Sequence, residues 1–503
     1  KMPKIINQSI SKYNAFKPVS LSDRTWPDSK INEAPIWCSV DLRDGNQALI
    51  EPMGEEKKLR MFKMLTEIGF KQIEVGFPSA SQTDYNFIRK IIVENLIPED
   101  VTIQVLTQSR KELISKTFEA LEGAPKAILH LYNSTSTLQR KVVFKSDRRG
   151  VKKIATDGAS FVRDLAEEYS STEWTFQYSP ESFTGTELEY AVEVCDAVVN
   201  IWEPTQNRKT IINLPATVEL STPNIYADQI EWMSRNLGHR ENILVSLHPH
   251  NDRGSAVAAT ELALMAGADR IEGTLFGNGE RTGNVDIVTL ALNMFTQSID
   301  PKLNFSDINP IMREVEYCNQ LPIHPRHPYG GDLVFTAFSG SHQDAIKKGL
   351  RAIKQSNNPL WEVPYLPIDP DDLGRSYEAV VRINSQSGKG GIAYLLEKDH
   401  GLSMPRRLQI EFSQIIQKIT DESGKEIIAS EIWETFQNTY FNNGAGFNFI
   451  EHKIESTSKN KSQEDLIKVK LLKDNEEYSV DGVGNGPIDA FINALKKDLD
   501  LSV

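Results

Sequence analysis

Hydrophobic and polar positions follow two different rhythms between residues 36 and 297. Short apolar runs rich in β-branched residues, typical of buried strands, alternate with longer amphipathic stretches that have helical spacing. The segments with strand character are 36–42, 72–77, 101–106, 126–132, 174–179, 210–217, 243–250 and 270–277. The stretches 55–70 and 224–237 are two of the helices expected between them. The pattern therefore predicts eight strands, each followed by a helix.

Strands that alternate with helices form a parallel sheet, and eight such units match an α/β fold of the closed (β/α)8 type, a TIM barrel. The alternative is an open doubly wound sheet, which requires a glycine-rich turn after its first strand. Residues 41–49 occupy that position and read DLRDGNQAL, with one glycine. The glycines of GNGERTGN at 277–284 do not have the G-x-G-x-x-G spacing of a dinucleotide site either. We therefore expect the barrel.

The pattern changes after the predicted barrel. Residues 358–374 are rich in proline and cannot form one continuous helix or a central strand, so we expect an extended linker there. Residues 402–440 have helical spacing, and 446–503 predict three strands followed by a helix that begins at Pro487. The predicted organisation is a barrel domain with an N-terminal extension at 1–331, a linker with helical subdomains at 332–445, and a small α+β domain at 446–503.

Composition narrows the class of protein. The chain has 503 residues, of which 39% are hydrophobic and 25% charged, as in ordinary globular proteins. Its formal net charge of −13 argues against a nucleic-acid partner. No apolar run is long enough to span a bilayer, and residues 1–19 lack the apolar centre of a secretory signal, although removal of a transit peptide stays open. The widely separated Cys38, Cys195 and Cys318 favour packed thiols in a reducing, cytoplasmic compartment.

The motif HPHNDRG follows the strand-like run at 243–247. Alternate residues of a strand face the same side, so His248 and His250 project together and can share one divalent metal. A bare His-x-His pair is more often a polar strand edge, and the metal interpretation needs a third ligand. Active-site residues of such barrels lie at the carboxyl ends of the strands, where Asp44 follows the first strand. We therefore predict a metal site that includes Asp44, with Asn284 as a source of a fourth oxygen.

Further polar residues occupy the same predicted rim. Arg43 follows the first strand, and His130 lies near the end of the fourth. Ser179 and Glu181 come after the fifth strand, and Thr217 ends the sixth. Polar side chains collected from separate strand ends are hard to explain as core packing, so these residues are candidates for substrate binding and catalysis.

The pattern does not decide whether two residues beyond the predicted barrel have a functional or a structural role. His342 in GSHQDA is as consistent with a surface histidine at a helix start as with a functional one. Tyr377 in GRSYEAV is more often a packing residue than a catalytic one.

Three motifs together resemble the α-isopropylmalate synthases: DLRDGNQAL at 41–49, HPHNDRG at 248–254 and GNGERTGNVD at 277–286. These enzymes belong to the metal-dependent barrels that condense an acyl-CoA with a ketoacid. The resemblance covers nearly the whole chain, because 329–349 and 383–396 look like the linker and second subdomain of the longer-chain branch of the family. Asn46 stands where the shorter branch has glutamate.

The resemblance implies that the chain condenses acetyl-CoA with 2-oxoisovalerate and hydrolyses the thioester to 2-isopropylmalate and free CoA. It also implies a homodimer and a divalent metal, Mg²⁺ or Mn²⁺ in use and Zn²⁺ as a substitute in crystals. It assigns metal binding to Asp44, His248 and His250 with Asn284 close by, the ketoacid pocket to His130, Ser179 and Thr217, the approach of acyl-CoA to Glu280 and Arg281, and catalysis to Arg43, Glu181, His342 and Tyr377. Among these, Arg43 would face the reacting ketone oxygen, and His342 would reach the active site of the neighbouring subunit.

Several alternatives stay open. Glu181 and His342 are both candidates for the base and for activation of the hydrolytic water. A lyase of the same fold would need only the barrel, and a metal-holding scaffold without catalysis would not need Arg43, Glu181 and Thr217 on one rim. The family's leucine-binding regulatory domain has two βββα units, whereas residues 446–503 predict one. We therefore expect a partial regulatory domain, either naturally short or truncated.

Overall fold

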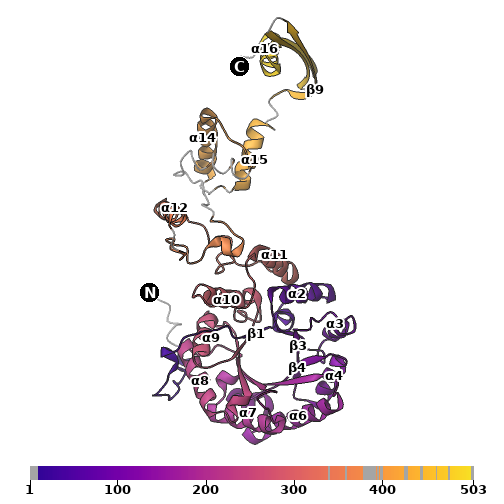
Figure 1. The fold of residues 1–503 in the computed structure, drawn as a ribbon, viewed down its shortest axis with the longest axis vertical. Helices are drawn as coiled ribbons and strands as arrows, with labels where there is room; N and C mark the ends of the chain where they lie inside the picture. The colour runs from indigo at the N-terminus through magenta and orange to yellow at the C-terminus, as the bar shows by residue number, and fades with distance from the viewer. Residues whose placement is uncertain are drawn as a thin grey trace. The chain divides into compact units, whose positions relative to one another are not determined.

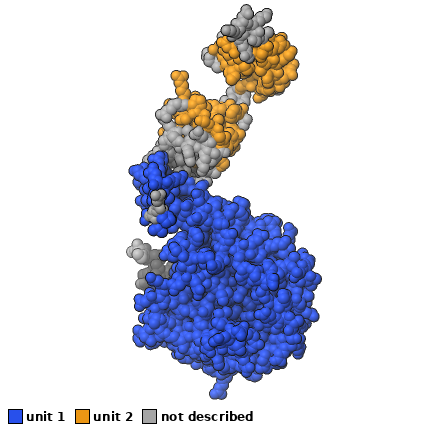
Figure 2. Space-filling view, in the orientation of Figure 1, with its two compact units in different colours: residues 1–378 blue, residues 379–503 orange. Residues whose placement is uncertain are grey.

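The computed structural model describes most of the chain. The described residues are 10–337, 340–356, 359–377, 392, 396, 400–423, 427, 429–441, 446–459, 462–473 and 476–499. They belong to two compact units, residues 1–378 and residues 379–503, which Figure 2 shows in different colours. The segment 383–391, which carries part of the predicted family motif, lies outside the described residues, as do residues 442–445 beside a predicted domain boundary. The domain boundaries at 331/332 and 445/446 stay predictions.

Unit 1 contains a closed parallel barrel of eight strands, as predicted (Figure 1). The strands are β1 Ile36–Ser39, β2 Gln72–Gly76, β3 Thr102–Gln108, β4 Lys126–Ser134, β5 Glu173–Glu181, β6 Thr210–Ala216, β7 Ile243–Pro249 and β8 Arg270–Gly273. Neighbours in sequence are neighbours in the sheet, and β1 closes the barrel by pairing with β8, for example Trp37 with Ile271. The carboxyl ends of all eight strands therefore meet at one rim.

A ring of helices surrounds these strands (Figure 1). The helices are α2 Glu55–Ile68, α3 Gln82–Val93, α4 Lys111–Leu121, α5 Thr137–Gln139, α6 Arg148–Glu168, α7 Leu188–Trp202, α8 Pro223–Asn236, α9 Ala256–Met265 and α10 Ile287–Phe295. On α2 the buried residues Met61, Leu65 and Ile68 are spaced three and four apart and form one face against the strands. The helix ends at Gly69, whose φ of 116° is the left-handed conformation that terminates helices.

The inside of the barrel is polar, whereas the hydrophobic core lies between strands and helices. On β2, Glu74 alternates with the buried Ile73 and Val75 because successive strand residues face opposite sides. Glu74 and Glu272 are fully buried and are linked by Gln104, whose Nε2 donates to both carboxylates at 2.5 and 2.8 Å. Buried charges of this kind are stable only when they are paired.

Strand lengths differ from the prediction at several places that shape the rim, and β8 ends at Gly273 although the pattern predicted a strand up to residue 277. β1 stops at Ser39, and residues 41–45 form a π-helical turn, since the Asp41 carboxylate accepts the backbone N–H of Leu275 and draws the chain toward the β8 side. β4 and β5 extend to Ser134 and Glu181, so His130 lies in the middle of β4 and not near its end. The pattern missed these extensions because their last residues are polar.

The remainder of unit 1 contains α11 Ile308–Asn319, α12 Gly340–Gln355 and a 3-10 turn Pro370–Leu373. The proline-rich stretch forms no other helix or strand over 359–374, in agreement with the predicted linker. Within the described residues, no helix combines the length and hydrophobicity that crossing a bilayer requires. Cys38, Cys195 and Cys318 are buried thiols without a disulfide partner, as the pattern predicted.

Unit 2 contains the helices α14 Arg406–Ser423 and α15 Ala429–Tyr440, followed by β9 Asn448–Lys459, β10 Ser462–Lys473, β11 Glu476–Gly484 and α16 Pro487–Leu499. The three strands form an antiparallel sheet in the order β11-β10-β9. Val469, Val480 and Ala494 belong to one buried cluster between this sheet and α16. The predicted order of three strands and a helix is therefore confirmed.

Candidate active site

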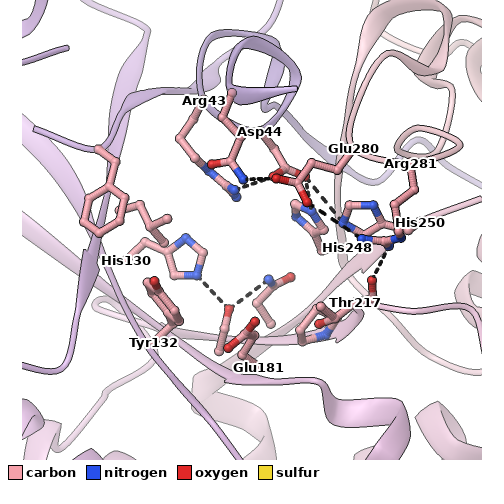
Figure 3. Close-up of a pocket in the computed structure, with 16 residues that line it drawn as sticks. Arg43, Asp44, His130, Tyr132, Glu181, Thr217, His248, His250, Glu280 and Arg281 are labelled. Carbon is pink, nitrogen blue, oxygen red and sulfur yellow. Dashed lines mark hydrogen bonds and ion pairs between the residues drawn. The ribbon is translucent and has the colours of Figure 1, made fainter. Parts of the chain in front are cut away.

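A pocket opens at the carboxyl ends of the barrel strands (Figure 3). It is lined by Arg43, Asp44, Gln47, Phe77, Leu106, His130, Tyr132, Ser179, Glu181, Asn213, Pro215, Thr217, His248, His250, Glu280 and Arg281. The rim residues predicted from the barrel pattern are therefore together in space. Asn284 is buried and pairs with His250 through an isolated backbone bridge. His342 and Tyr377 are not among the lining residues of this pocket.

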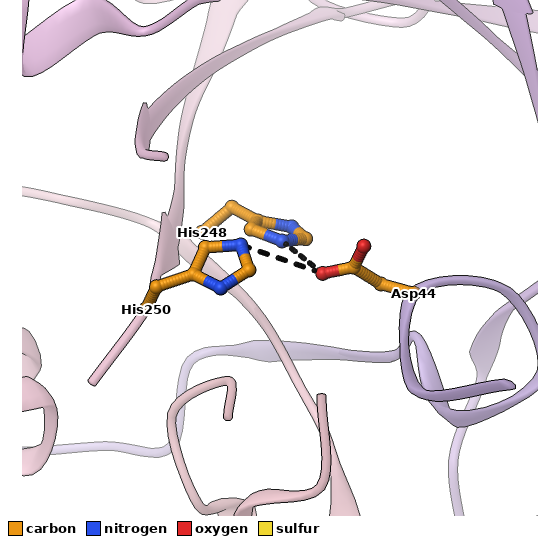
Figure 4. Close-up of side chains that lie close together, drawn as sticks. All are labelled: Asp44, His248 and His250. Atoms are coloured by element: carbon orange, nitrogen blue, oxygen red, sulfur yellow. Dashed lines mark hydrogen bonds and ion pairs between the residues drawn. The ribbon is translucent and has the colours of Figure 1, made fainter. Parts of the chain in front are cut away.

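Asp44, His248 and His250 form a compact group of buried ligand atoms that could hold a metal (Figure 4). The Oδ2 atom of Asp44 lies 3.1 Å from Nε2 of His248 and 3.5 Å from Nε2 of His250. Asp44 is on the π-helical turn after β1, and the two histidines are at the end of β7. The Oδ1 atom of the neighbouring Asn284 is buried and has no hydrogen-bond partner in the described structure. A divalent ion would satisfy such an atom, so these residues fit a metal.

The protonation of the two histidines differs. Burial and the neighbouring His248 lower the pKa of His250 to about 4, so its imidazole is neutral and able to bind a metal at neutral pH. Burial opposes protonation of His248 as well, but its hydrogen bonds to Asp44 and Glu272 raise the pKa to about 9. Burial would raise the pKa of Asp44, but Arg43 and the histidines hold it below its usual range. The carboxylate is therefore ionised, as a metal ligand must be.

Glu74, His130 and Glu272 form a second buried group with metal-ligand spacing. Its ligand atoms are already engaged, since Gln104 donates to both carboxylates and Glu74 accepts from Nε of Arg43. Among the described residues, the Asp44 group is therefore the better candidate for a metal, and the second group is a scaffold beneath it.

Arg43 lies between the two groups. Its Nε donates to Glu74 and its Nη1 donates to Asp44 Oδ1 at 2.7 Å. The side chain is 10% exposed, and the exposed part faces the pocket. Burial disfavours the charged form, but Glu74 and Asp44 outweigh it and raise the pKa of Arg43, so a fixed positive charge is held beside the candidate metal site.

A chain of hydrogen bonds crosses the pocket from β2 to β6. Glu74 Oε2 lies 2.7 Å from Nδ1 of His130, whose Nε2 lies 2.7 Å from Ser179 Oγ. Asn213 Nδ2 also donates to Ser179 Oγ at 2.9 Å. The imidazole of His130 therefore connects the Glu74 carboxylate with the Ser179 hydroxyl.

Two further predicted residues are held by a side chain of β4 and by the backbone just after β5. Glu181 accepts a hydrogen bond from the hydroxyl of Ser134. Thr217 Oγ1 accepts from the backbone N–H of Ser182 at 2.9 Å, and its hydroxyl hydrogen is left as a possible donor to a ligand.

The loop after β8 forms the outer wall. Glu280 accepts from Gln47 Nε2 at 2.7 Å. Arg281 donates to Asp252 at 2.6 Å and to the backbone carbonyl of Thr217 at 2.6 Å. These contacts tie the loops after β1, β6, β7 and β8 together at the pocket entrance.

The sequence pattern did not single out five buried polar residues that lie in or next to the pocket. These are Glu74, Gln104, Asn213, Arg270 and Glu272. A signal was present, because Glu74, Gln104 and Asn213 each interrupt an apolar run, and the short strand β8 carries the charged Arg270 and Glu272. A charged or amide side chain at an inward position of a buried strand needs a specific partner, and several such positions indicate a polar network.

Comparison with known proteins gives matches along the chain. The HMGL-like family model matches residues 34–315, the alpha-isopropylmalate synthase post-catalytic domain-like model matches 332–397, and the LeuA allosteric (dimerisation) domain model matches 426–503. The 2-isopropylmalate synthase of Rhodospirillum rubrum is 62% identical over 493 residues, which is 98% of this chain and 88% of that protein. The chain belongs to the 2-isopropylmalate synthase family. The 2-isopropylmalate synthases of Parvibaculum lavamentivorans and Rhizobium meliloti are 59% and 61% identical, over 98% and 97% of this chain and 87% of each relative.

Membership of the 2-isopropylmalate synthase family confirms the predicted family and agrees with the observed barrel. The HMGL-like match contains every residue that lines the pocket, and the post-catalytic match contains His342 and Tyr377. The family is metal-dependent, and Asp44, His248 and His250 are the candidate ligands in this structure.

Proposed function

We propose that this pocket is where the chain carries out the reaction of its family. As a 2-isopropylmalate synthase, the chain is an acyltransferase that condenses acetyl-CoA with 2-oxoisovalerate and releases 2-isopropylmalate and free CoA, the first committed step of leucine biosynthesis. The observation that carries the assignment to this pocket is the Asp44, His248 and His250 group beside the fixed cation of Arg43.

The metal site would consist of Asp44, His248 and His250, with Asn284 supplying a further oxygen. The two oxygen donors suit Mg²⁺ or Mn²⁺, and the two imidazoles suit Zn²⁺, so the same four residues can accept each of these ions. An ion bound there would act as a Lewis acid that polarises the ketone of the ketoacid.

Arg43 would stabilise the alkoxide that forms when the acetyl carbon attacks the ketone. Its guanidinium is held on two sides by Glu74 and Asp44, so it is oriented before the reaction begins. A preorganised donor aimed at charge that develops in the transition state lowers the barrier without a cost of reorganisation.

The opposite side of the pocket would bind the ketoacid carboxylate and its side chain. Thr217 has a hydroxyl hydrogen to donate, and Ser179 and His130 share a hydrogen-bond chain that a substrate oxygen can join. Phe77 and Leu106 supply apolar lining for a short branched side chain. The lining arginines Arg43 and Arg281 are already paired with carboxylates, which disfavours the distal carboxylate of 2-oxoglutarate.

The proton from the acetyl methyl group has two candidate acceptors. Glu181 lines the pocket, whereas His342 does not line the pocket of its own chain. We propose that a second copy of the chain supplies His342 and Tyr377, and that the protein is a homodimer. The match of 426–503 to the LeuA dimerisation domain supports this assembly.

The function is tested by supplying a panel of ketoacids with acetyl-CoA and measuring the release of CoA with a thiol reagent. The specificity constant should be highest for 2-oxoisovalerate, with slower turnover of pyruvate and 2-oxobutyrate, since one methylene in an apolar pocket is worth only about 1–3 kcal/mol. A higher constant for 2-oxoglutarate would overturn the substrate assignment. The His250→Ala variant should lose turnover and metal binding while its melting temperature stays close to that of the wild type.

A further inference from the structure

Lys58 on α2 is a buried cation that the reaction does not require as a reactant. Its side chain is 0% exposed, and its ammonium group contacts the backbone of the turn after β1 and of β2. The Nζ atom donates to the backbone carbonyl of Leu42 at 2.8 Å and to that of Val75 at 3.3 Å, and it forms an ion pair with Asp84 at 2.6 Å. The three donors of the ammonium group therefore have three acceptors.

These acceptors have a specific relation to the active site. Leu42 immediately precedes Arg43 in the π-helical turn, and Val75 immediately follows Glu74 in β2. Lys58 thus contacts the backbone next to each partner of the Arg43–Glu74 ion pair. One buried ammonium group therefore bridges the two segments, and the residue after Arg43 in the turn is the candidate metal ligand Asp44.

The counter-charge is held as firmly as the lysine. Asp84 Oδ2 accepts the backbone N–H of Phe77 at 2.8 Å, and Asp84 sits against Gly76, where an added Cβ would lie 2.8 Å from the aspartate side chain. Burial lowers the pKa of Lys58, whereas Asp84 opposes that change. A buried ion pair contributes little net stability compared with an apolar pair of the same shape, so stability alone does not explain it.

We propose that Lys58 is a positioning residue for the metal site: it docks the turn that bears Arg43 and Asp44 onto β2, and so sets metal affinity and turnover without touching substrate. This inference rests on the proposed site at Asp44, His248 and His250. Its effect is expected to be large, because groups that orient metal ligands typically change affinity or activity by about 10- to 100-fold when they are removed.

Two variants separate positioning from stability. Asp84→Asn removes the counter-charge but leaves Lys58 bound to both carbonyl groups, so it should lose stability and keep its Mn²⁺ affinity within about threefold of the wild type. Lys58→Met combined with Asp84→Asn removes both charges and also frees the turn. The double variant should be no less stable than Asp84→Asn, yet bind Mn²⁺ about 10- to 100-fold more weakly.

The full chain is titrated with Mn²⁺ alone, and the free ion is monitored by electron paramagnetic resonance. The kcat of each variant is then measured at saturating Mn²⁺. Equal Mn²⁺ affinity and kcat in the double variant and Asp84→Asn would overturn the proposal. Failure of the double variant to fold would also overturn it, because Lys58 would then be needed by the barrel itself. His250→Ala distinguishes the two levels: if it binds Mn²⁺ like the wild type, the metal site itself is misassigned.

Discussion

Glu272 allows the energetics of the scaffold beneath the pocket to be tested. Its carboxylate is fully buried and accepts hydrogen bonds from Arg270, Gln104 and Gln177 at 2.7–2.8 Å. It also lies 2.7 Å from Nδ1 of His248. Arg270 and the histidines hold the pKa of Glu272 well below its usual range against the opposing effect of burial, so the group is ionised in the folded protein.

Glu272→Ala would leave Arg270 as a buried cation without its carboxylate partner. Removal of one member of a buried pair typically costs about 3–5 kcal/mol, and we expect a loss of that size in the free energy of unfolding. His248 would also lose the acceptor that keeps its proton on Nδ1, so metal affinity should fall by about 10- to 100-fold. Urea denaturation monitored by tryptophan fluorescence measures the free energy of unfolding, and titration with Mn²⁺ measures the metal affinity.

The matched control removes both charges through Arg270→Met together with Glu272→Ala, and it is compared with each of these single variants. No unpaired buried charge is left, so the double variant should be more stable than the sum of the two single losses predicts. A loss below about 1 kcal/mol in Glu272→Ala, or additive losses in the double variant, would refute the view that this pair is energetically coupled.

Three further predictions concern other parts of unit 1. Gly283→Ala should reduce activity at least tenfold, because φ is +102° and a Cβ would lie 1.9 Å from the Gly277 carbonyl oxygen. The control Gly254→Ala, where φ is also positive but no atom lies within 4 Å of the added Cβ, should cost only about 1 kcal/mol of stability. Equal losses of activity in the two variants would contradict the steric argument. Burial would raise the pKa of Glu187, but hydrogen bonds from Arg140 and Arg148 lower it to about 2, so the stabilising contribution of Glu187 is present above about pH 4.5 and is lost as the pH falls toward 2. The difference in unfolding free energy between the wild type and Glu187→Gln should therefore shrink on acidification. A constant difference would argue against the ion pairs. Protomers with His342→Ala mixed with protomers carrying Arg43→Ala should recover activity if the active site is shared between subunits, and verified exchange without recovery would exclude sharing.

Much of the barrel was predictable because its signals are local. The alternation of short apolar runs with amphipathic stretches predicted eight strands in the correct order, and each observed strand overlaps its predicted segment, although several strand ends differ. His248 and His250 were recognisable as a pair because two residues of one strand face the same side whatever the rest of the fold does. The order of three strands and a helix in unit 2 was likewise visible in the pattern.

Only the closed barrel decided which distant groups meet. Asp44 and His248 are separated by 204 positions, and they come within 3.1 Å because β1 and β7 both end at the rim and β8 joins them. Arg43 and His130 both meet Glu74, and Lys58 contacts Leu42 in the turn that contains Arg43. These contacts depend on which side of each strand faces inward and on where a strand stops. The sequence by itself determined the periodicity, and with it the number and order of the strands. The tertiary structure determined the electrostatics, because protonation and hydrogen bonding in a buried site depend on neighbours that are remote along the chain.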